Sequence, residues 1–311
     1  MMRKRRFQNK AAASSATLPL CAITTVLLWC LGGSYTAPLL WGWAACAIIT
    51  YLWAETSNTF SLIRIRTMLT PALYALLAGV AFHLHAFSYS TVVTLCIILS
   101  YNSLFRSYQR HDASVPVFHA FLCLSLGSLF LAPLLYFVPF YLWYCIAYLR
   151  SLHWRTLWAA ILGLVLPYWL VGGYQVAFGS LQWFTAHWNA LIPTWPPHPD
   201  SYLAAGYPAL SLTALVLVVS FIASVHAIRT SFNDKIRVRM YTYVLLSQQL
   251  LIVLFMALQP QHFKPLSSLL YMNSAPLLAH YFALTSHRLT NLLFVLTLII
   301  LAITALMYLW N

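Results

Sequence analysis

Charged residues are scarce in this chain, and acidic residues are nearly absent. Of the 311 residues, 7% are charged and only 4 are Asp or Glu, whereas 62% are hydrophobic. A soluble domain of this length would need far more charge to cover its surface. The mean hydropathy of +0.78 points the same way. We therefore expect a chain that folds with lipid as its solvent.

Sequence motifs of common soluble enzymes are also missing. The chain has no Walker loop, no dinucleotide-binding glycine motif, no HExxH, no Gly-x-Ser-x-Gly and no CxxC. These absences argue against a soluble-type ATPase, dehydrogenase or metalloprotease. The 6 cysteines all fall within apolar runs, where they are most simply small embedded hydrophobes. We predict neither a bound metal nor a cofactor.

The sequence is rich in long apolar runs with Gly and Pro inside them, as membrane helices tolerate. Runs of about 17–22 residues match the thickness of the hydrocarbon layer. They predict an all-α, polytopic membrane bundle of about ten or eleven transmembrane helices. We expect one transmembrane domain over residues 16–311, preceded by a basic cytoplasmic tail over residues 1–15. The expected spans are 16–33, 37–54, 67–84, 88–104, 115–131, 133–149, 156–178, 206–228, 241–258, 266–285 and 290–310.

The distribution of basic residues predicts the orientation of these helices. The net charge of +13 comes from small groups of Lys and Arg between apolar runs. Because no single domain gathers this charge, we expect no nucleic-acid partner. With the N-terminus in the cytoplasm, every Lys and Arg except Lys264 falls on the inner side, as the positive-inside rule requires. We predict a multi-pass protein of a bacterial inner membrane with an external C-terminus.

One external loop, residues 179–205, differs from the others. Phe184, Trp188 and Leu191 recur in it at helical spacing, which predicts a short amphipathic helix in the outer interface. The proline-rich run over residues 193–200 is expected to be extended. This run is either a stiff connector or a binding lid.

Asp200 is the only carboxylate on the external side in this topology. Any reaction that needs an external acid or base must use it, so Asp200 is the candidate catalytic residue. In the alternative interpretation it caps a helix that begins near Ser201. His187 and His198 lie close to it in sequence. The three side chains are candidate metal ligands, unless they are simply solvated.

A basic stripe is predicted at the inner end of the fourth span. Asn102, Arg106 and Arg110 fall on one helical face at i, i+4 and i+8, and Arg155 lies on the next internal loop. Two like charges one turn apart repel unless an anion lies between them. The stripe is a candidate site for a lipid phosphate, or it only snorkels to acidic lipids. We expect membrane lipid as a partner and leave a lipid-linked substrate or further membrane-protein subunits open.

Uncharged polar residues occur near the middle of two neighbouring spans. Gln248 and Gln249 lie halfway along one span, and Asn273 and Ser274 lie in the next. These side chains are candidates for lining a cavity, or they hold the two helices together by hydrogen bonds. No span carries Asp, Glu, Lys or Arg near its centre, which disfavours transport coupled to an intramembrane carboxylate.

A set of residues between Tyr101 and Tyr168 carries a family resemblance. In these residues the chain resembles a family of polytopic inner-membrane proteins of Bacteroidota that has no established activity. The resemblance implies a multi-pass inner-membrane protein and no particular reaction. The residues concerned are Tyr101-Asn102, Arg106, Gly127 to Phe130, Pro133, Trp154-Arg155, Gly163 and Pro167-Tyr168.

The same stretch also looks distantly like the membrane half of polyprenyl-phosphate-dependent glycosyltransferases. Those enzymes carry an acid in the first external loop, whereas the loop here, from Gly32 to Tyr35, holds none. Three functions stay open. We favour a non-enzymatic membrane component or assembly factor. The alternatives are a transporter or flippase of a lipid-linked or amphiphilic substrate and an enzyme acting on a polyprenyl- or lipid-linked substrate.

Overall fold

The computed structural model describes residues 6–32, 36–179, 182–192 and 200–310. Within these ranges the chain is helical and contains no strand, which confirms the predicted all-α fold. The chain divides into two compact units. Unit 1 comprises Met1–Thr91 and His198–Asn311, and unit 2 comprises Val92–Pro197. The single domain expected over residues 16–311 stays a prediction.

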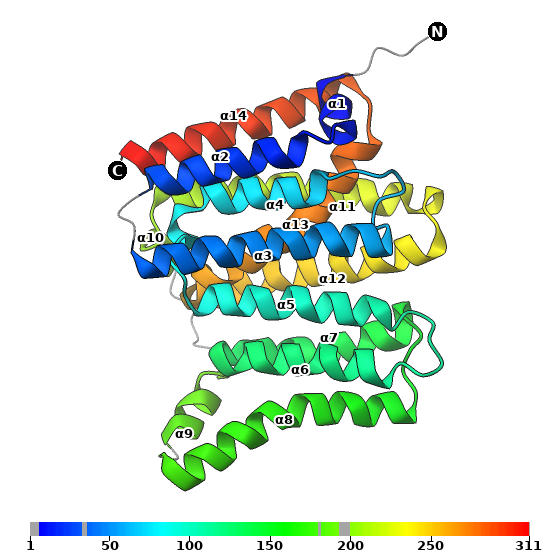
Figure 1. Ribbon diagram of the computed structural model, residues 1–311, viewed down its shortest axis with the longest axis vertical. Coiled ribbons are helices and arrows are strands. Elements are labelled where there is room, and N and C mark those ends of the chain that lie inside the picture. Colours follow the sequence, from blue (N-terminus) through cyan, green and yellow to red (C-terminus); the bar gives the residue numbers. More distant parts are fainter. Residues whose placement is uncertain (1–5, 33–35, 180–181, 193–199, 311) are drawn as a thin grey trace. The chain divides into compact units, whose positions relative to one another are not determined.

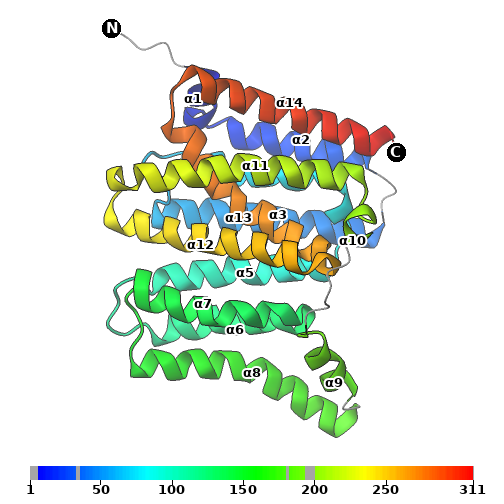
Figure 2. The same ribbon diagram turned by 180° about the vertical axis from the view of Figure 1, so that it is seen from behind.

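Unit 1 is built from both ends of the chain (Figures 1 and 2). It also includes the first residues of α5 (Tyr89–Arg106). Its other elements are α1 (Phe7–Ala13), α2 (Thr17–Leu31), α3 (Ala37–Phe60), α4 (Leu69–Val80), η1 (Phe82–Leu84), α10 (Asp200–Leu203), α11 (Tyr207–Thr230), η4 (Ser231–Asn233), α12 (Ile236–Leu258), η5 (Pro260–His262), α13 (Phe263–Leu284) and α14 (Arg288–Trp310).

Unit 2 contains the rest of α5 and the elements that follow it. These are α6 (Ser114–Phe130), η2 (Ala132–Phe137), α7 (Val138–Trp143), η3 (Tyr144–Tyr148), α8 (Trp154–Phe178) and α9 (Gln182–Asn189). The helices α6 and α8 pack closely. A Cβ atom added at Gly163 of α8 would lie 2.5 Å from the carbonyl oxygen of Phe118 in α6. Glycine is required there because the two backbones approach each other directly.

Every predicted span coincides with a helix or a group of short helices, and several of them can cross a membrane. In the part of the chain that the structure describes, five helices qualify as spans by length and composition: α3, α8, α11, α12 and α14. There are six if α1 and α2, which are bent by 96° at the break between them, form one broken span. The apolar helices α4 and α6 are shorter than the helices that qualify. The protein is thus a multi-pass membrane protein, and the full count of ten or eleven spans stays a prediction.

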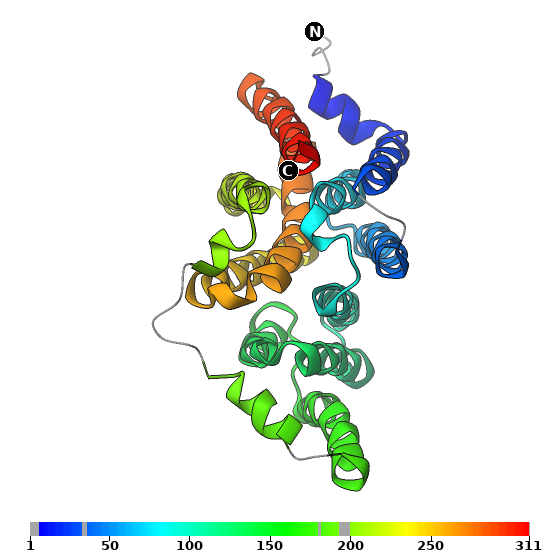
Figure 3. The ribbon, with the colours of Figure 1, turned by 90° about the vertical axis from the view of Figure 1, so that its left-hand side faces the viewer.

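Helix α13 forms the core of unit 1. All of its residues are buried except Lys264, Ser268 and Leu284. It contacts α4, α11 and α12, and Figure 3 shows it between α4 and α11. Because other helices cover α13 on all sides, its polar side chains must find partners within the protein.

The basic N-terminal tail expected over residues 1–15 is partly folded. Residues Phe7–Ala13 form α1, in which Gln8 is fully buried. The Gln8 Nε2 donates to the carbonyl oxygen of Thr285, 2.6 Å away, and to Oγ1 of Thr290, 3.1 Å away. Helix α1 is therefore fastened across the connection between α13 and α14.

The basic connections of each unit lie together at one end of that unit. In unit 1, Oγ1 of Thr67 donates to the carbonyl oxygen of Ala12, and Arg64 donates to that of Asn233. Lys264 lies in the first turn of α13, at the opposite end of this 22-residue helix from the basic connections. The two ends of α13 are about 33 Å apart at 1.5 Å per residue. In unit 2, the Gln109 amide donates to the Leu149 carbonyl oxygen across 2.8 Å. Each unit thus has the segregation of charge that the predicted orientation requires.

Candidate functional site

A pocket lies in unit 2 where α5 ends and α6 begins. Its volume is about 360 Å³. We call it the basic pocket. It combines two arginines with an acid, a histidine, a hydroxyl and two apolar side chains. The lining residues are Ser103, Arg106, Arg110, Asp112, Val115, Pro116 and His119.

The local fold explains why these side chains meet. Helix α5 ends at Arg106, and the left-handed backbone of Gln109 (φ 51°) turns the chain toward α6. Ser107 and Ser151 are joined by a hydrogen bond of 3.2 Å, which ties this turn to the connection before α8. Arg110 follows the turn and faces the start of α6.

The predicted stripe does not continue along one helical face, because α5 ends at Arg106, although Arg106 and Arg110 line the same pocket. Arg106 and Arg110 are exposed and line the basic pocket. Asn102 is only 8% exposed and lies on the buried face of α5. Arg155 lies in the first turn of α8 and is close enough to influence the ionisation of Asp112. Their role in binding a lipid phosphate stays a prediction.

Asp112 is the member of the pocket that sequence reasoning missed. The Ser114 hydroxyl donates to its Oδ1 across 2.5 Å, and the Ser114 amide lies 3.4 Å away. These two hydrogen bonds, followed by the charges of Arg155 and His111, hold the pKa of the Asp112 carboxyl below its usual range. Its position two residues after Arg110 was the available signal. The carboxylate offsets one arginine, so Arg106, Arg110 and Asp112 together carry a net positive charge.

Three of the four predicted cavity residues of unit 1, Gln249, Asn273 and Ser274, form a hydrogen-bond network. Gln248, Gln249, Asn273 and Ser274 are all buried. Asn273 Nδ2 donates to Gln249 Oε1 (2.7 Å) and to the Leu245 carbonyl oxygen (3.0 Å). Gln249 Nε2 donates to the Ser274 hydroxyl at 2.9 Å. These contacts join α12 to α13, which is the arrangement that the helix-joining interpretation predicts.

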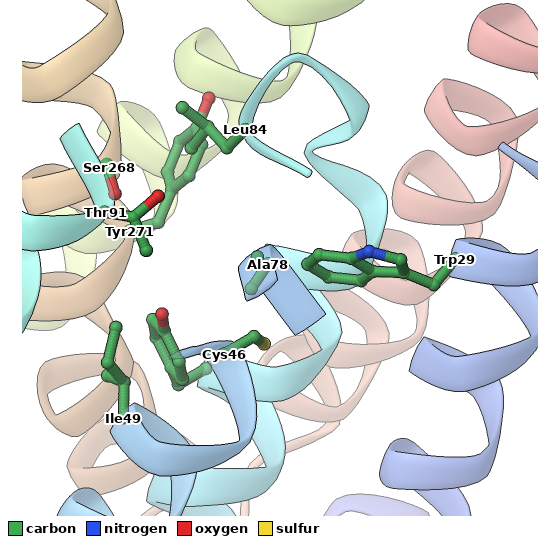
Figure 4. Close-up of a pocket in the computed structure, with 10 residues that line it drawn as sticks. Trp29, Cys46, Ile49, Ala78, Leu84, Thr91, Ser268 and Tyr271 are labelled. Atoms are coloured by element: carbon green, nitrogen blue, oxygen red, sulfur yellow. The ribbon is translucent and has the colours of Figure 1, made fainter. Parts of the chain in front are cut away.

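An internal pocket next to α13 is small. Its volume is about 30 Å³, which is room for about one water molecule. Figure 4 shows Trp29, Cys46 and Tyr271 around it. The Tyr271 hydroxyl is bonded to Thr213 of α11 across 2.7 Å. A substrate of lipid or sugar size does not fit in this space.

A buried pair of titratable groups lies at the basic end of unit 1. Asp234 Oδ2 and His280 Nε2 are 3.0 Å apart, and both side chains are 3% exposed. The Arg64 guanidinium lies at the outer side of this pair, with Nε 4.0 Å from Asp234 Oδ1. Sequence reasoning placed Asp234 in a loop and missed the pair, because the two residues are far apart in the chain.

The helix predicted in the external loop is present as α9, and its location in the outer interface stays a prediction. Its His187 is 9% exposed, and burial lowers the pKa of its imidazole. The Tyr168 hydroxyl lies 3.0 Å from His187 Nε2 and 2.7 Å from the Ser128 hydroxyl. The ring of Trp183 stacks on the imidazole at 4.8 Å. The contact with Tyr168 docks α9 on α8, Ser128 of α6 holds Tyr168 in place, and one of the two ring nitrogens of His187 is already used.

The outer face of α9 is less exposed than its spacing predicts. Trp188 is 48% exposed, as expected for an interfacial aromatic. Phe184 is half-buried, because its ring packs over Gly172 of α8. The Leu191 carbonyl oxygen accepts a hydrogen bond from the hydroxyl of Tyr136. Helix α9 therefore rests on the protein along one edge instead of facing lipid along its whole length.

The structure assigns the other external candidates to different units. Asp200 is exposed and begins α10 in unit 1, whereas His187 belongs to unit 2. His198 and most of the proline-rich run over residues 193–200 lie outside the described residues. In the described ranges, no group of three or more His, Cys, Asp or Glu side chains is placed to hold a metal ion. The catalytic and metal-binding roles of these residues stay predictions.

No protein-family model matches the chain, and neither the curated proteins nor the solved structures contain a match to it.

Proposed function

We propose that the protein is a non-enzymatic component of a bacterial inner membrane that binds a phosphate-bearing lipid at the basic pocket. The observation that carries the proposal is the meeting of Arg106 and Arg110 in one pocket beside Val115 and Pro116. Arginine matches a phosphate because its planar fork donates two parallel hydrogen bonds to two oxygens.

The composition of the pocket suits a lipid headgroup better than a soluble anion. The phosphate would lie between the two guanidinium groups and relieve their mutual repulsion. Val115 and Pro116 offer apolar contact to the glycerol and the first methylenes of a chain. The volume of about 360 Å³ is within the range of small-molecule pockets, about 300–1,000 Å³. Arg155 adds a further positive charge near Asp112.

A non-enzymatic role is favoured by the interior of unit 1. The amide and hydroxyl groups of Gln249, Asn273 and Ser274 bond to one another, so they serve to join helices. The pocket beside Tyr271 has room for about one water molecule. These features support a packed membrane component without an internal substrate site. Acidic lipid at the basic pocket would then be recruited by this component or would regulate it.

The test removes the two charges and measures lipid retention. The double variant Arg106→Gln/Arg110→Gln should retain phosphatidylglycerol several-fold less than the natural chain in native mass spectra. The matched control is Arg229→Gln/Arg288→Gln, which removes the same charge from two exposed arginines at the basic end of unit 1. Equal losses in the two double variants would show unspecific snorkelling and would end the proposal.

A further inference from the structure

A second basic pocket lies in unit 1, between the connection from α3 to α4 and the start of α12. Its volume is about 440 Å³. We call it the anion pocket. Its polar lining includes Ser57, Ser61, Arg64, Arg66 and Lys235. Sequence reasoning assigned these basic residues to orientation in the membrane and to no site.

The charge of the anion pocket is of one sign. Arg64, Arg66 and Lys235 contribute three cationic groups, and none of its lining residues is acidic. Like charges gathered around one cavity repel one another in the absence of an anion. This composition differs from that of the basic pocket in unit 2, where Asp112 offsets one arginine.

The N-terminus of α12 adds a positive dipole at the same place. Lys235 is the N-cap residue of this 23-residue helix, and Val238, which also lines the pocket, lies in its first turn. No side chain caps this helix end, and its first turn contains no acid. The amide groups at such a helix end favour a bound anion.

The wall of the pocket also contains an unused hydrogen-bonding group. The Ser57 hydroxyl oxygen is buried and has no hydrogen-bond partner among the described residues. A buried hydroxyl without a partner costs about 1–3 kcal/mol. An oxyanion in the pocket would give this hydroxyl an acceptor. The unpartnered Ser57 hydroxyl therefore supports anion binding independently of the basic side chains.

Arg64 lies between the anion pocket and the buried pair behind it. Its side chain is 39% exposed, its Nε is 4.0 Å from Asp234 Oδ1, and its Nη1 donates to the Asn233 carbonyl oxygen at 3.4 Å. The Asp234 side chain is only 3% exposed and is held by His280. A ligand in the pocket and the Asp234 carboxylate therefore compete for one guanidinium group.

We propose that the anion pocket binds a phosphate-class anion, either the phosphate of a lipid headgroup or a free phosphate, and that Asp234 weakens this binding by holding Arg64. The proposal concerns a different unit and different residues from the basic pocket, so it does not depend on the proposed function.

The geometry predicts effects of opposite sign for the two members of the ion pair. Arg64→Gln removes a phosphate ligand and should weaken binding about tenfold, as expected for the loss of one charge-assisted hydrogen bond. Asp234→Asn keeps the size and an acceptor for His280 but removes the competing negative charge, so it should tighten binding several-fold. If the ion pair has only a structural role, both variants should bind phosphate as well as the natural chain does, or less well.

The experiment uses the full chain in nanodiscs and has two arms. In phosphatidylcholine nanodiscs, inorganic phosphate is titrated by calorimetry. In nanodiscs containing phosphatidylglycerol, retained lipid is counted by native mass spectrometry. If Arg64→Gln lowers only the affinity for inorganic phosphate, the ligand is a soluble anion. If it lowers only the number of retained phosphatidylglycerol molecules, the ligand is a lipid headgroup. No change in either arm overturns the proposal.

Two further variants keep the test decisive. Because Asp234 is buried and its substitution can impair folding, Arg66→Gln and Lys235→Gln, both at exposed positions, should each weaken binding by several-fold without loss of folded protein. Arg106→Gln/Arg110→Gln should leave phosphate binding in unit 1 unchanged. Retention of full affinity by Arg66→Gln and Lys235→Gln would refute the anion pocket, whatever the result for the basic pocket.

Discussion

The side-chain amide of Asn273 donates to Oε1 of Gln249 across 2.7 Å, between α13 and α12. Both residues are buried. The Nε2 of Gln249 donates further hydrogen bonds to the hydroxyls of Ser274 and of Ser220 in α11. A single network thus connects three helices of unit 1. In a membrane, where helices gain little from apolar contact with each other, such bonds help to specify which helices pair.

Replacing Asn273 by Leu should destabilise unit 1 because it leaves Gln249 Oε1 without its donor. The expected loss is about 1–3 kcal/mol for a buried polar group deprived of its partner, with membrane helix pairs nearer the lower value. Unfolding in a graded series of SDS and mild detergent measures the change. In a double-mutant cycle, Gln249→Leu should cost less in the Asn273→Leu background than alone. Additive costs would show that the two side chains do not interact.

The docking of α9 should depend on pH through His187. Burial lowers the pKa of this imidazole below its ordinary value of about 6.5, so the docked helix favours the neutral form. Docking is therefore fully stable above about pH 6.5 and weakens as the pH falls through the undocked and then the docked pKa. The protection of the Gln182–Asn189 amides, measured as their exchange rate relative to the intrinsic rate at each pH, should decrease between pH 7.5 and pH 5.

The control for this prediction is His187→Gln. Glutamine keeps a donor and an acceptor near the Tyr168 hydroxyl but does not titrate. The exchange of α9 in this variant should no longer change with pH beyond the intrinsic dependence of amide exchange. A variant that retains the full pH response would assign the effect to another group.

The positions of the helices were predictable because each depends on local composition. An apolar run long enough to cross the hydrocarbon layer is visible in the sequence itself, and α9 followed from the spacing of Phe184 and Trp188. The burial of Gln8 was not predictable. Its partner Thr285 is 277 residues away, and nothing in a basic, polar tail indicates which distant carbonyl group it will meet.

The candidate sites show the same division. Arg106 and Arg110 were predicted to meet because they are four residues apart. They do line one pocket, but α5 ends at Arg106, and it is the turn at Gln109, not helical periodicity, that places Arg110 there. Arg64 and Lys235 meet because the end of α3 and the start of α12 lie at the same side of unit 1, and only the packing of the helices determines this contact. Closeness in the sequence therefore predicts which side chains of one connection meet, whereas sites assembled from distant connections are not readable from sequence.

The orientation in the membrane should be the one that basic residues dictate. Reporter fusions placed after Arg110, Arg155 and Arg239 should all behave as cytoplasmic, because the connections that carry them are basic. A fusion after Lys264 should behave as external. The opposite end of α13 contacts Gln8 of the N-terminal segment, which is predicted to be cytoplasmic. An external signal after any of the three arginines would contradict the predicted number of spans before that point.

The close approach of α6 and α8 should make Gly163 intolerant of any side chain. A Cβ atom there would lie 2.5 Å from the Phe118 carbonyl oxygen, a backbone atom that cannot turn aside, so the two helices must separate. We expect Gly163→Ala to destabilise unit 2 by about 1–3 kcal/mol, the usual cost of overpacking. The unfolding series in SDS and mild detergent measures it.

Gly173, in the same helix, provides the matched control. An added Cβ there meets nothing within 4 Å, so Gly173→Ala should gain the helix propensity of alanine, about 0.5–1 kcal/mol, and stabilise the protein. The two substitutions are chemically identical and differ only in what lies opposite. Equal effects would show that the α6–α8 contact is looser than the structure has it. Opposite signs would establish that unit 2 is held together by direct backbone contact at Gly163.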